Sequence, residues 1–429
     1  MKEFFKKIVI LILTIEARMV LLRHRPKIVV VTGTVGKTSA KDAIFAVFNT
    51  FFYARKSQKS FNSEIGIPLT ILDLKNKWNS PIGWFKNILL GFAEIFLPTI
   101  YPKWLILEIG TDHPGDIKST AKWLSPHVVV TTQFADIPVH VEFFDSPEDV
   151  IEEEQSIAYA LRKNGALIAN NDDPHSVELA RKLDRRVISF GIGEKAGVRA
   201  SHIETLYKDQ KPIGIRFRAD HEEMSGPVSI AGSLGVQHVY PILAALATGI
   251  SQGLNIVKMS RVFDEYKAPA GRMRIIRGQQ NATIIDDSYN SSPVAVERAL
   301  EVVKNLEVPG RKVVILGDMR ELGKYAKKEH GRVGELAGQV ADFLIFVGEH
   351  SRDFSTGALK SKIKKQNILE FDTANQAILY MQKNLKKDDL ILIKGSQSVR
   401  LEKVVRALMR DPEESSKLLV RQEAEWTKR

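Results

Sequence analysis

The chain has 429 residues, 44% of them hydrophobic and 26% charged, which is enough for two or three globular domains. It has no cysteine, which excludes disulfides, thiolate metal sites and a cysteine nucleophile and fits a reducing, cytoplasmic location. The formal net charge of +11 suits nucleotide phosphates or anionic lipid; because no RNA-binding signature or helix-turn-helix stands out, we expect no nucleic-acid partner.

Residues 1–25 predict an amphipathic helix. The uninterrupted apolar run, from Ile8 to Leu13, is shorter than the roughly 20 residues of a membrane span, and no signal-peptide cleavage site follows. Such a helix either packs on its own domain or lies on an anionic membrane, and the sequence leaves both open. The apolar residues that recur at helical spacing are Phe4, Ile8, Leu11, Ile15, Met19 and Leu22.

Residues 27–51 predict a strand, a glycine turn and a helix in direct succession. The β-branched run 28–31 is typical of a buried parallel strand, and Lys37, Thr38 and Ser39 open the helical segment. This order cradles phosphates: backbone N–H groups face the anion, Lys37 neutralises it, and the Thr38 hydroxyl can hold Mg²⁺. Val31 replaces the first glycine of the general Walker pattern, so the loop is a shorter variant. The predicted nucleotide-binding positions are Gly33, Thr34, Gly36, Lys37, Thr38 and Ser39.

Strand and helix patterns alternate along most of the chain, which predicts an α/β fold with mostly parallel sheets. Residues 198–230 alternate like antiparallel strands, and a break at 268–272 (APAGR) precedes a second strand and helix alternation. We therefore expect an amphipathic helix over 1–25, a central P-loop ATP-binding domain over 26–267, and a Rossmann-like α/β domain over 268–429. An apolar insert at 75–101, with the character of the first helix, adds to the expectation of membrane contact.

Polar side chains follow several predicted strands, at the edge where open parallel sheets place their ligands. Glu108 ends one strand near the phosphate loop and is a natural Mg²⁺ ligand. One acidic residue after a strand is usually a helix cap, but several such positions on the same side are hard to explain as caps. The other positions are His140 and Glu142 after the strand at 128–132, then residues 286–290, Asp318 and residues 394–396.

The motifs, taken in order, resemble the Mur ligase family over residues 27–410. They are most similar to the members that attach D-alanyl-D-alanine to a UDP-linked muramoyl tripeptide. The resemblance implies that ATP phosphorylates a carboxylate to an acyl phosphate, releasing ADP, and that an amine then displaces phosphate. The motifs are TGTVGKTS, FNSEIGIPLT, LEIGTDHPGDI, APAGRMR, IIDDSYNSSP, LGDMRELG and LIKGSQSV.

The resemblance also implies roles for individual residues. Lys37 and Mg²⁺ would stabilise the transferring phosphoryl group, and Arg272 would reach the nucleotide phosphates. Because two domains contribute, the site is expected to form on closure. The remaining matches are Thr38 and Glu108 for a first metal, His140 for a second, Asp287 and Asn290 on the nucleotide side, and Asp318, His330, Lys394 and Ser396 on the acceptor side.

Three departures from the family pattern matter. The family carries a carbamoylated lysine fourteen residues after its metal-binding histidine, and counting from His140 reaches Glu154. We predict that Glu154 supplies this second-metal carboxylate directly; the alternative is a solvated acidic helix face. The adenine-side motif is altered at His238 and Pro241. The phosphate loop starts where relatives still have a UDP-binding domain, so we expect that domain to be missing.

The sequence thus predicts a monomeric, cytoplasmic enzyme that uses ATP and Mg²⁺ and takes small-molecule substrates: a cell-wall precursor carboxylate and an amino-acid or dipeptide amine. Peripheral contact with an anionic membrane surface is a further expectation. Two alternatives stay open: the same chemistry on a poly-amino-acid or lipid-linked acid, and a non-catalytic nucleotide-binding subunit. A P-loop switch GTPase is disfavoured, because no Asn-Lys-x-Asp motif follows a strand.

Overall fold

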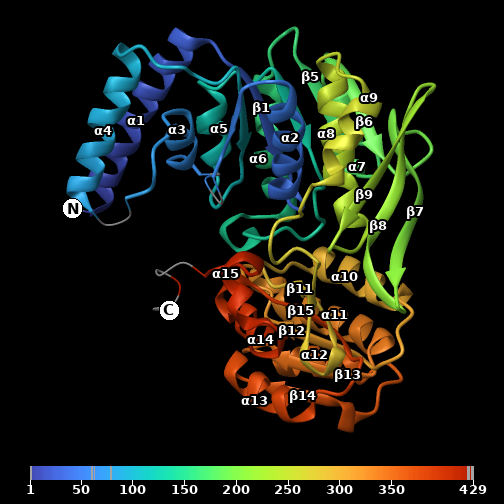
Figure 1. The fold of residues 1–429 in the computed structure, drawn as a ribbon. Helices are drawn as coiled ribbons and strands as arrows, with labels where there is room; N and C mark the ends of the chain where they lie inside the picture. Colours follow the sequence, from blue (N-terminus) through green and yellow to red (C-terminus); the bar gives the residue numbers. More distant parts are fainter. Residues whose placement is uncertain (1, 59–60, 62, 78–79, 423–425, 427–429) are drawn as a thin grey trace.

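The computed structural model describes residues 2–58, 61, 63–77, 80–422 and 426, with side chains from Phe5 onward. Two α/β units are stacked, the first around a nine-stranded sheet and the second around a six-stranded sheet (Figure 1). In the first sheet, neighbours from β2 to β7 run parallel, and β7, β8 and β9 run antiparallel, as expected for residues 198–230. Its order is β2 (Ala54–Lys56), β3 (Trp104–Glu108), β1 (Lys27–Thr32), β4 (Val128–Thr131), β5 (Ala166–Asn170), β6 (Arg186–Gly191), β7 (Val198–Lys208), β8 (Lys211–His221) and β9 (Met224–Ala231).

Both faces of the first sheet are buried, which explains the continuous apolar runs of its parallel strands. Val29 and Val31 point to the core under α2 (Lys37–Phe51) and α8 (Val239–Ser251). Ile28 and Val30 point to the opposite core. The helices over that opposite face are α1 (Lys2–His24), α3 (Gly66–Ile71), α4 (Pro81–Phe96), α5 (Asp116–Ala121) and α7 (Pro174–Lys182); α6 (Pro147–Gln155) and α9 (Ile256–Ser260) complete the unit.

The second unit begins with an antiparallel edge strand, and its other neighbours are parallel. Its order is β10 (Arg274–Arg277), β11 (Thr283–Asp287), β15 (Leu390–Lys394), β12 (Lys312–Gly317), β13 (Phe343–Val347) and β14 (Ile368–Phe371). Its helices are α10 (Pro293–Asn305), α11 (Ala326–Val340), α12 (Ser351–Ala358), α13 (Ala374–Asn384), α14 (Glu402–Leu408) and α15 (Ser415–Leu418).

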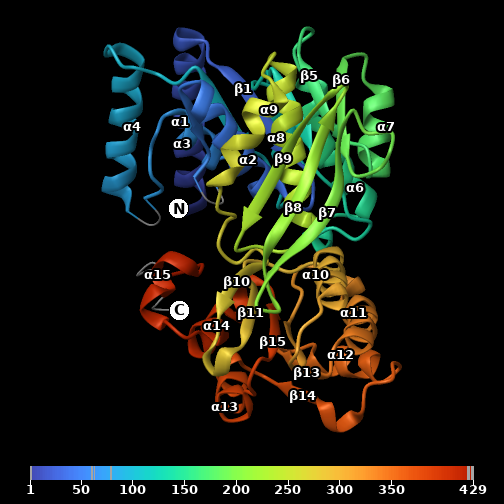
Figure 2. The same cartoon turned by 45° about the vertical axis from the view of Figure 1, so that its right-hand side comes forward.

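The long β7–β8 hairpin reaches from the first unit to the second (Figures 1 and 2). The backbone N–H of Glu307 donates to the Tyr207 hydroxyl at 3.3 Å, and the Lys211 ammonium donates to the carbonyl of Asn281 at 2.5 Å. The hairpin therefore contacts the second unit with its tip.

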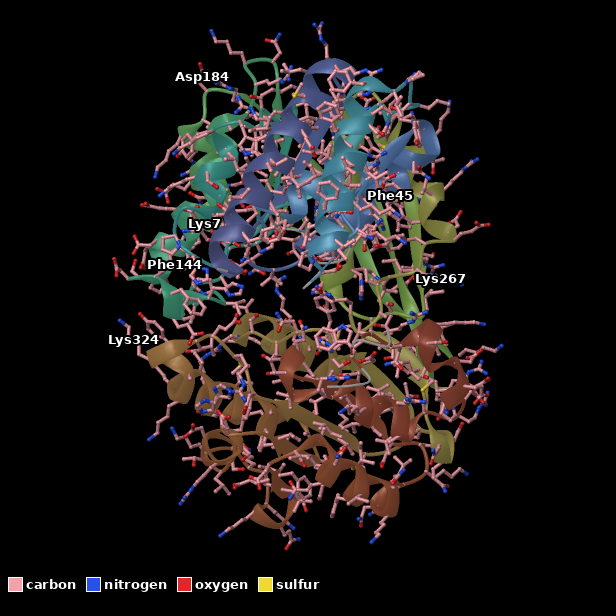
Figure 3. The ribbon with its side chains drawn as sticks, turned by 90° about the vertical axis from the view of Figure 1, so that its left-hand side faces the viewer. Lys7, Phe45, Phe144, Asp184, Lys267 and Lys324 are labelled. Atoms are coloured by element: carbon pink, nitrogen blue, oxygen red, sulfur yellow. The ribbon has the colours of Figure 1, made fainter. Side chains whose placement is uncertain are left out.

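Helices α1 and α4 lie together on one side of the first unit, which faces the viewer in Figure 3. The residues of α1 that enter the core are Val9, Leu13, Ala17 and Val20. The apolar stripe noted in the sequence is a different one: from Ile8 to Leu22 its side chains are 39% to 75% exposed. The helix therefore packs on its own domain, but through a face other than the predicted stripe, which stays exposed. Phe4 lies outside the described side chains. No helix in the described part of the chain is long and apolar enough to cross a membrane.

Candidate active site between the two units

The turn after β1 has the geometry of a phosphate loop. Gly33 (φ 122°) and Gly36 (φ 89°) adopt left-handed conformations that favour glycine, and a Cβ on Gly33 would collide with the Thr132 side chain. Helix α2 starts at Lys37 without an acidic residue in its first turn. The positive end of its dipole is therefore free to attract an anion.

Glu154 lies directly against this loop. Its Oε1 is 3.0 Å from the Lys37 ammonium, its Oε2 accepts from the Thr34 hydroxyl at 3.0 Å, and its carbonyl accepts from the Thr32 hydroxyl at 2.8 Å. The side chain is buried, so this ion pair is shielded from solvent. The predicted position thus lies in the phosphate loop environment, although its spacing was the only signal for it.

The two preceding glutamates point elsewhere, because successive residues on a helix are about 100° apart. Glu153 is buried and its Oε1 accepts from the backbone N–H groups of Ile117 (2.8 Å) and Lys118 (2.9 Å), at the start of α5. Glu152 is exposed. A solvated acidic face therefore describes Glu152 alone.

Glu108 forms a second carboxylate position one strand away. Its Oε1 accepts from the Thr38 hydroxyl at 2.9 Å, and its Oε2 is 3.2 Å from the ammonium of Lys41. Lys41 is fully buried on α2, one turn after Lys37, and the sequence interpretation missed it. The only signal was its spacing of four residues from Lys37, which places both on one helix face.

The oxygen donors of Thr38, Glu108 and Glu154 are of the type that Mg²⁺ prefers. In the described residues, however, no three His, Asp or Glu side chains converge closely enough to hold a metal by themselves. A Mg²⁺ ion here would therefore complete its shell with water and ligand oxygens, as this ion usually does. The donor set fits the ion.

His140 contacts the second unit instead of the predicted first-unit metal ligands. Its Nδ1 is 2.8 Å from Oε2 of Glu321, and its Nε2 is 3.6 Å from Oδ1 of Asp112. Burial by itself lowers the pKa of His140, but the hydrogen bond to Glu321 and the charges of both carboxylates outweigh burial and raise it. Glu321, which the sequence interpretation did not single out, therefore joins the two units at this point.

A cleft of about 880 Å³ opens between the units around this contact. It brings together residues that are far apart in the sequence and that belong to both units. They include His140, Glu142, Asn290, Arg320, Glu321, Ser396, Arg400 and Trp426.

In the second unit, Lys394 and Asp287 form a buried ion pair of 2.7 Å. The Lys394 ammonium also donates to the carbonyl of Asn290 at 2.9 Å, and Asp287 Oδ1 accepts from the N–H of Met273 at 3.2 Å. The Arg272 guanidinium lies over the Tyr289 ring, 4.3 Å from its centre. These residues converge at the carboxyl ends of β11 and β15, as expected for a site in a parallel sheet.

Asp318 and His330 are fully buried behind the cleft wall, and their predicted acceptor-side roles stay predictions. Asp318 accepts from the N–H groups of Glu349 and His350, both at 3.0 Å. His330 Nε2 accepts from the N–H of Met319 at 2.9 Å, and burial lowers the pKa of His330 to about 4. The two side chains therefore hold the loop that carries Arg320 and Glu321 into the cleft.

A narrow recess of about 30 Å³ lies beside the phosphate loop and borders both units. Tyr240 lines it, with its hydroxyl 3.1 Å from Oδ2 of Asp172 and its ring 5.4 Å from the Arg298 guanidinium. His238 is buried nearby, with Nε2 2.9 Å from the carbonyl of Arg272, and burial lowers its pKa to about 4. Val35, Gly36, Asn170, Phe190 and Gln237 also line the recess.

A phosphate loop in one α/β unit, facing a second α/β unit across a polar cleft, defines a two-unit P-loop protein. Family comparison matches residues 96–249 to the Mur ligase middle domain and residues 271–397 to the glutamate ligase domain of Mur ligases, together well over half of the chain. The chain belongs to the Mur ligase family.

Several relatives carry the name UDP-N-acetylmuramoyl-tripeptide–D-alanyl-D-alanine ligase. The Bacillus subtilis protein is 27% identical over 389 residues, which cover 90% of this chain and 76% of the relative. The Escherichia coli protein is 26% identical over 391 residues, 89% of this chain and 76% of the relative.

Solved structures of MurF ligases share the fold. The Thermotoga maritima MurF ligase in complex with ADP aligns with a TM-score of 0.74 and 24% identity, covering 95% of this chain and 84% of that chain. MurF from Acinetobacter baumannii aligns with a TM-score of 0.75 and 22% identity, covering 92% and 79%. The expected α/β class, with large and mostly parallel sheets, is confirmed.

Proposed function

We propose that this protein is an ATP-dependent carboxylate–amine ligase that forms an amide bond through an acyl phosphate. Its preferred amine would be D-alanyl-D-alanine or a similar dipeptide, and its acid a peptidoglycan precursor. The main support is the Lys37–Glu154 pair beside a glycine turn at the border of the two units, where Val35 and Gly36 share a recess with Arg298 of the second unit. This arrangement can present a phosphoryl donor and two further substrates to one another.

Each side of the cleft has a distinct task in this proposal. Lys37 and the amides at the start of α2 bind the β- and γ-phosphates and stabilise charge that develops during transfer. Thr38 and Glu108 would hold a first Mg²⁺ and Glu154 would supply a carboxylate to a second; when bound, these ions would supply Lewis-acid stabilisation of the phosphoryl oxygens. Tyr240 and Arg298 at the narrow recess would flank the nucleoside.

The second unit would hold the acceptor and the substrate acid. Arg320 and Arg400 line the cleft wall, but Arg320 is paired with Asp318 and Glu349 and Arg400 with Glu402, so a substrate carboxylate would have to share these guanidinium groups. Lys394 binds Asp287 and the carbonyl of Asn290, and it thereby positions the loop that follows β11. This loop is held in place without any rearrangement of Lys394. His140 would be a ligand of the second metal, which would require its Nδ1 or Nε2 to be free of the contact to Glu321 or Asp112.

The place of action would be the cytoplasmic surface of an anionic membrane. The exposed apolar stripe of α1 and the exposed side chains of α4 face the same side of the first unit, and the chain is strongly basic. Flotation on anionic liposomes, with and without residues 1–25, tests this; equal flotation of both would contradict it.

An ADP-release assay tests the ligase proposal. Purified protein would receive ATP, Mg²⁺, a UDP-linked muramoyl tripeptide and D-alanyl-D-alanine, and ADP should appear only when acid and amine are both present. Repeating the assay with poly-glutamate or a lipid-linked acid, and with L-amino acids, distinguishes the proposal from the same chemistry on another acid. The absence of ADP with every acid–amine pair would favour a non-catalytic nucleotide-binding subunit.

A further inference from the structure

A basic hollow lies at the end of the first sheet opposite the phosphate loop. It opens between the last turn of α1 and the starts of β1 and β4, with a volume of about 540 Å³. No aspartate or glutamate of the described chain is among its lining residues. The side chains that define it, called here the arginine hollow, are Arg18, Arg25, Trp123, His127 and Arg162.

The arginine hollow has no counter-charge of its own. The side chains of Arg18 and Arg25 form no ion pair or hydrogen bond within the described residues, and Arg162 donates only to the carbonyl of Ser125, at 3.1 Å. His127 adds no charge, because burial and the nearby cations lower its pKa to about 4. Three guanidinium groups without a carboxylate are suited to a phosphate group, which they can contact in bidentate geometry.

The backbone at Arg25 is in a conformation that arginine does not favour. It has a φ of 48°, directly after the end of α1, and its N–H donates to the carbonyl of Leu21 at 3.0 Å. Glycine or asparagine usually occupies this position after a helix, since the left-handed conformation costs other residues about 1 kcal/mol. An arginine here gives up some stability and adds a cation to the hollow.

An apolar surface adjoins the arginine hollow. Leu22, 75% exposed, belongs both to the hollow lining and to the exposed stripe of α1. On α1, Glu16 faces α4, and the stripe lies between this contact and Arg18. The outer face of α4 continues the surface with exposed Ile82, Phe85, Leu89, Leu90, Phe92 and Phe96.

We propose that the arginine hollow binds the phosphate of an anionic phospholipid while the exposed faces of α1 and α4 lie in the interfacial layer of the bilayer. Helices that lie in this layer combine an apolar face with flanking cations, and Trp123 fits the same boundary. This inference rests on the proposed membrane association and is independent of the ligase chemistry. A second copy of the chain suits the surface less well, because a two-fold contact would bring the same unpaired arginines together.

The test compares two triple variants with the same change in net charge. R18Q/R25Q/R162Q removes the hollow's cations, and R277Q/R352Q/R406Q removes three exposed arginines of the second unit. Binding would be measured by flotation with phosphatidylcholine vesicles, with and without phosphatidylglycerol. At about 1 kcal/mol for each basic residue near an anionic surface, the hollow variant should bind phosphatidylglycerol vesicles roughly a hundredfold more weakly, and the control less than threefold.

The outcomes separate the two proposals. If the wild-type protein binds no vesicle, the membrane association itself is wrong. If it binds, and both triple variants weaken binding equally, the association stands and the headgroup site is wrong. Thermal unfolding of both variants checks that they fold. If the hollow variant alone does not fold, the single variant R18Q replaces it in the binding assay, and it should bind vesicles about fivefold more weakly than the wild type.

Two further measurements address other occupants. Both triple variants would be titrated with inorganic phosphate; because both keep the phosphate loop, a difference between them reports on the hollow alone. If only the control variant binds phosphate, and the two variants bind vesicles equally, the hollow is a site for free phosphate and not for a lipid headgroup. Sedimentation velocity of wild type and of L22S/F85S/F92S would reveal self-association. A dimer that the apolar variant abolishes, without any effect of the hollow on lipid binding, would overturn the proposal.

Discussion

The two ends of the first sheet treat charge in opposite ways. At the phosphate loop, both lysines of α2 have a carboxylate partner: Lys37 with Glu154, and Lys41 with Glu108. At the arginine hollow, the cations have no carboxylate among the described residues. One end is an internally neutral site in which a bound nucleotide must compete for partners, and the other attracts anions at long range.

The contrast extends to a carboxylate near the hollow end. Glu16 is buried between α1 and α4 at the close approach of Gly91, and its Oε2 has no hydrogen-bond partner in the described part of the chain. At the phosphate-loop end, the charged side chains are therefore paired with opposite charges. The α1–α4 side depends on apolar packing and carries an unmatched acid.

The largest expected effect is on Lys37. K37M should lower ADP release at least about a hundredfold, because it removes the cation that stabilises the transferring phosphoryl group. It should also lower the free energy of unfolding by a few kcal/mol, since Glu154 then loses its buried partner. K37M/E154Q should regain stability but not activity; K360M, an exposed lysine, is the control. Wild-type turnover of K37M would show that the paired cation is not used.

Glu154 comes next. E154Q should reduce Mg²⁺-dependent ADP release at least about tenfold, because the amide keeps the shape but supplies no negative charge to the metal. The readout is initial rate against Mg²⁺ concentration, in which the variant should need more Mg²⁺. E152Q makes the same charge change at an exposed position of the same helix and should behave as wild type. An unaltered Mg²⁺ dependence in E154Q would reject the role.

Glu16 sharpens the other side of the comparison through pH. Burial raises its pKa from 4.5 to about 7, so the folded protein holds this proton more tightly than the unfolded chain. Its ionisation therefore lowers stability increasingly from pH 4.5 up to about 7. E16Q should raise the free energy of unfolding by about 2–3 kcal/mol at pH 8 and much less at pH 5. Urea unfolding at both pH values measures this, and an equal effect at both would contradict the assignment.

The smallest effect is expected at Arg25. R25G should gain about 0.5–1 kcal/mol of stability, because glycine adopts a φ of 48° freely. R18G, inside α1, should lose about 1 kcal/mol. Both should weaken binding to phosphatidylglycerol vesicles. If R25G is instead less stable than the wild type, the Arg25 side chain stabilises the fold, and the claim that arginine is unfavourable at this position is wrong.

The sequence predicted the parts of the site that depend on local order. The phosphate loop follows from a β-branched run, two glycines and Lys37. The assigned catalytic and metal-binding roles stay predictions. The His140–Glu321 contact could not be foreseen, because it depends on how two units meet.

Other features depended on contacts that no single segment encodes. The arginine hollow combines residues from positions 18 to 162, which the sheet topology alone brings together. The exposure of the α1 stripe could not be predicted either, because α1 has a second apolar face that fills the core. An amphipathic pattern shows that one face is apolar without showing which neighbour covers it.

The β7–β8 hairpin has a mechanical consequence. It contacts the second unit through Tyr207 and Lys211, in the half of the first sheet that ends at β9. If these contacts persist while the cleft narrows, the units must rotate about the hairpin tip as about a fulcrum. A small rotation about the tip becomes a larger displacement at the side of the cleft that is farthest from it. The distance of Glu321 from the hairpin tip, more than the stiffness of the cleft walls, would then set how far Glu321 moves.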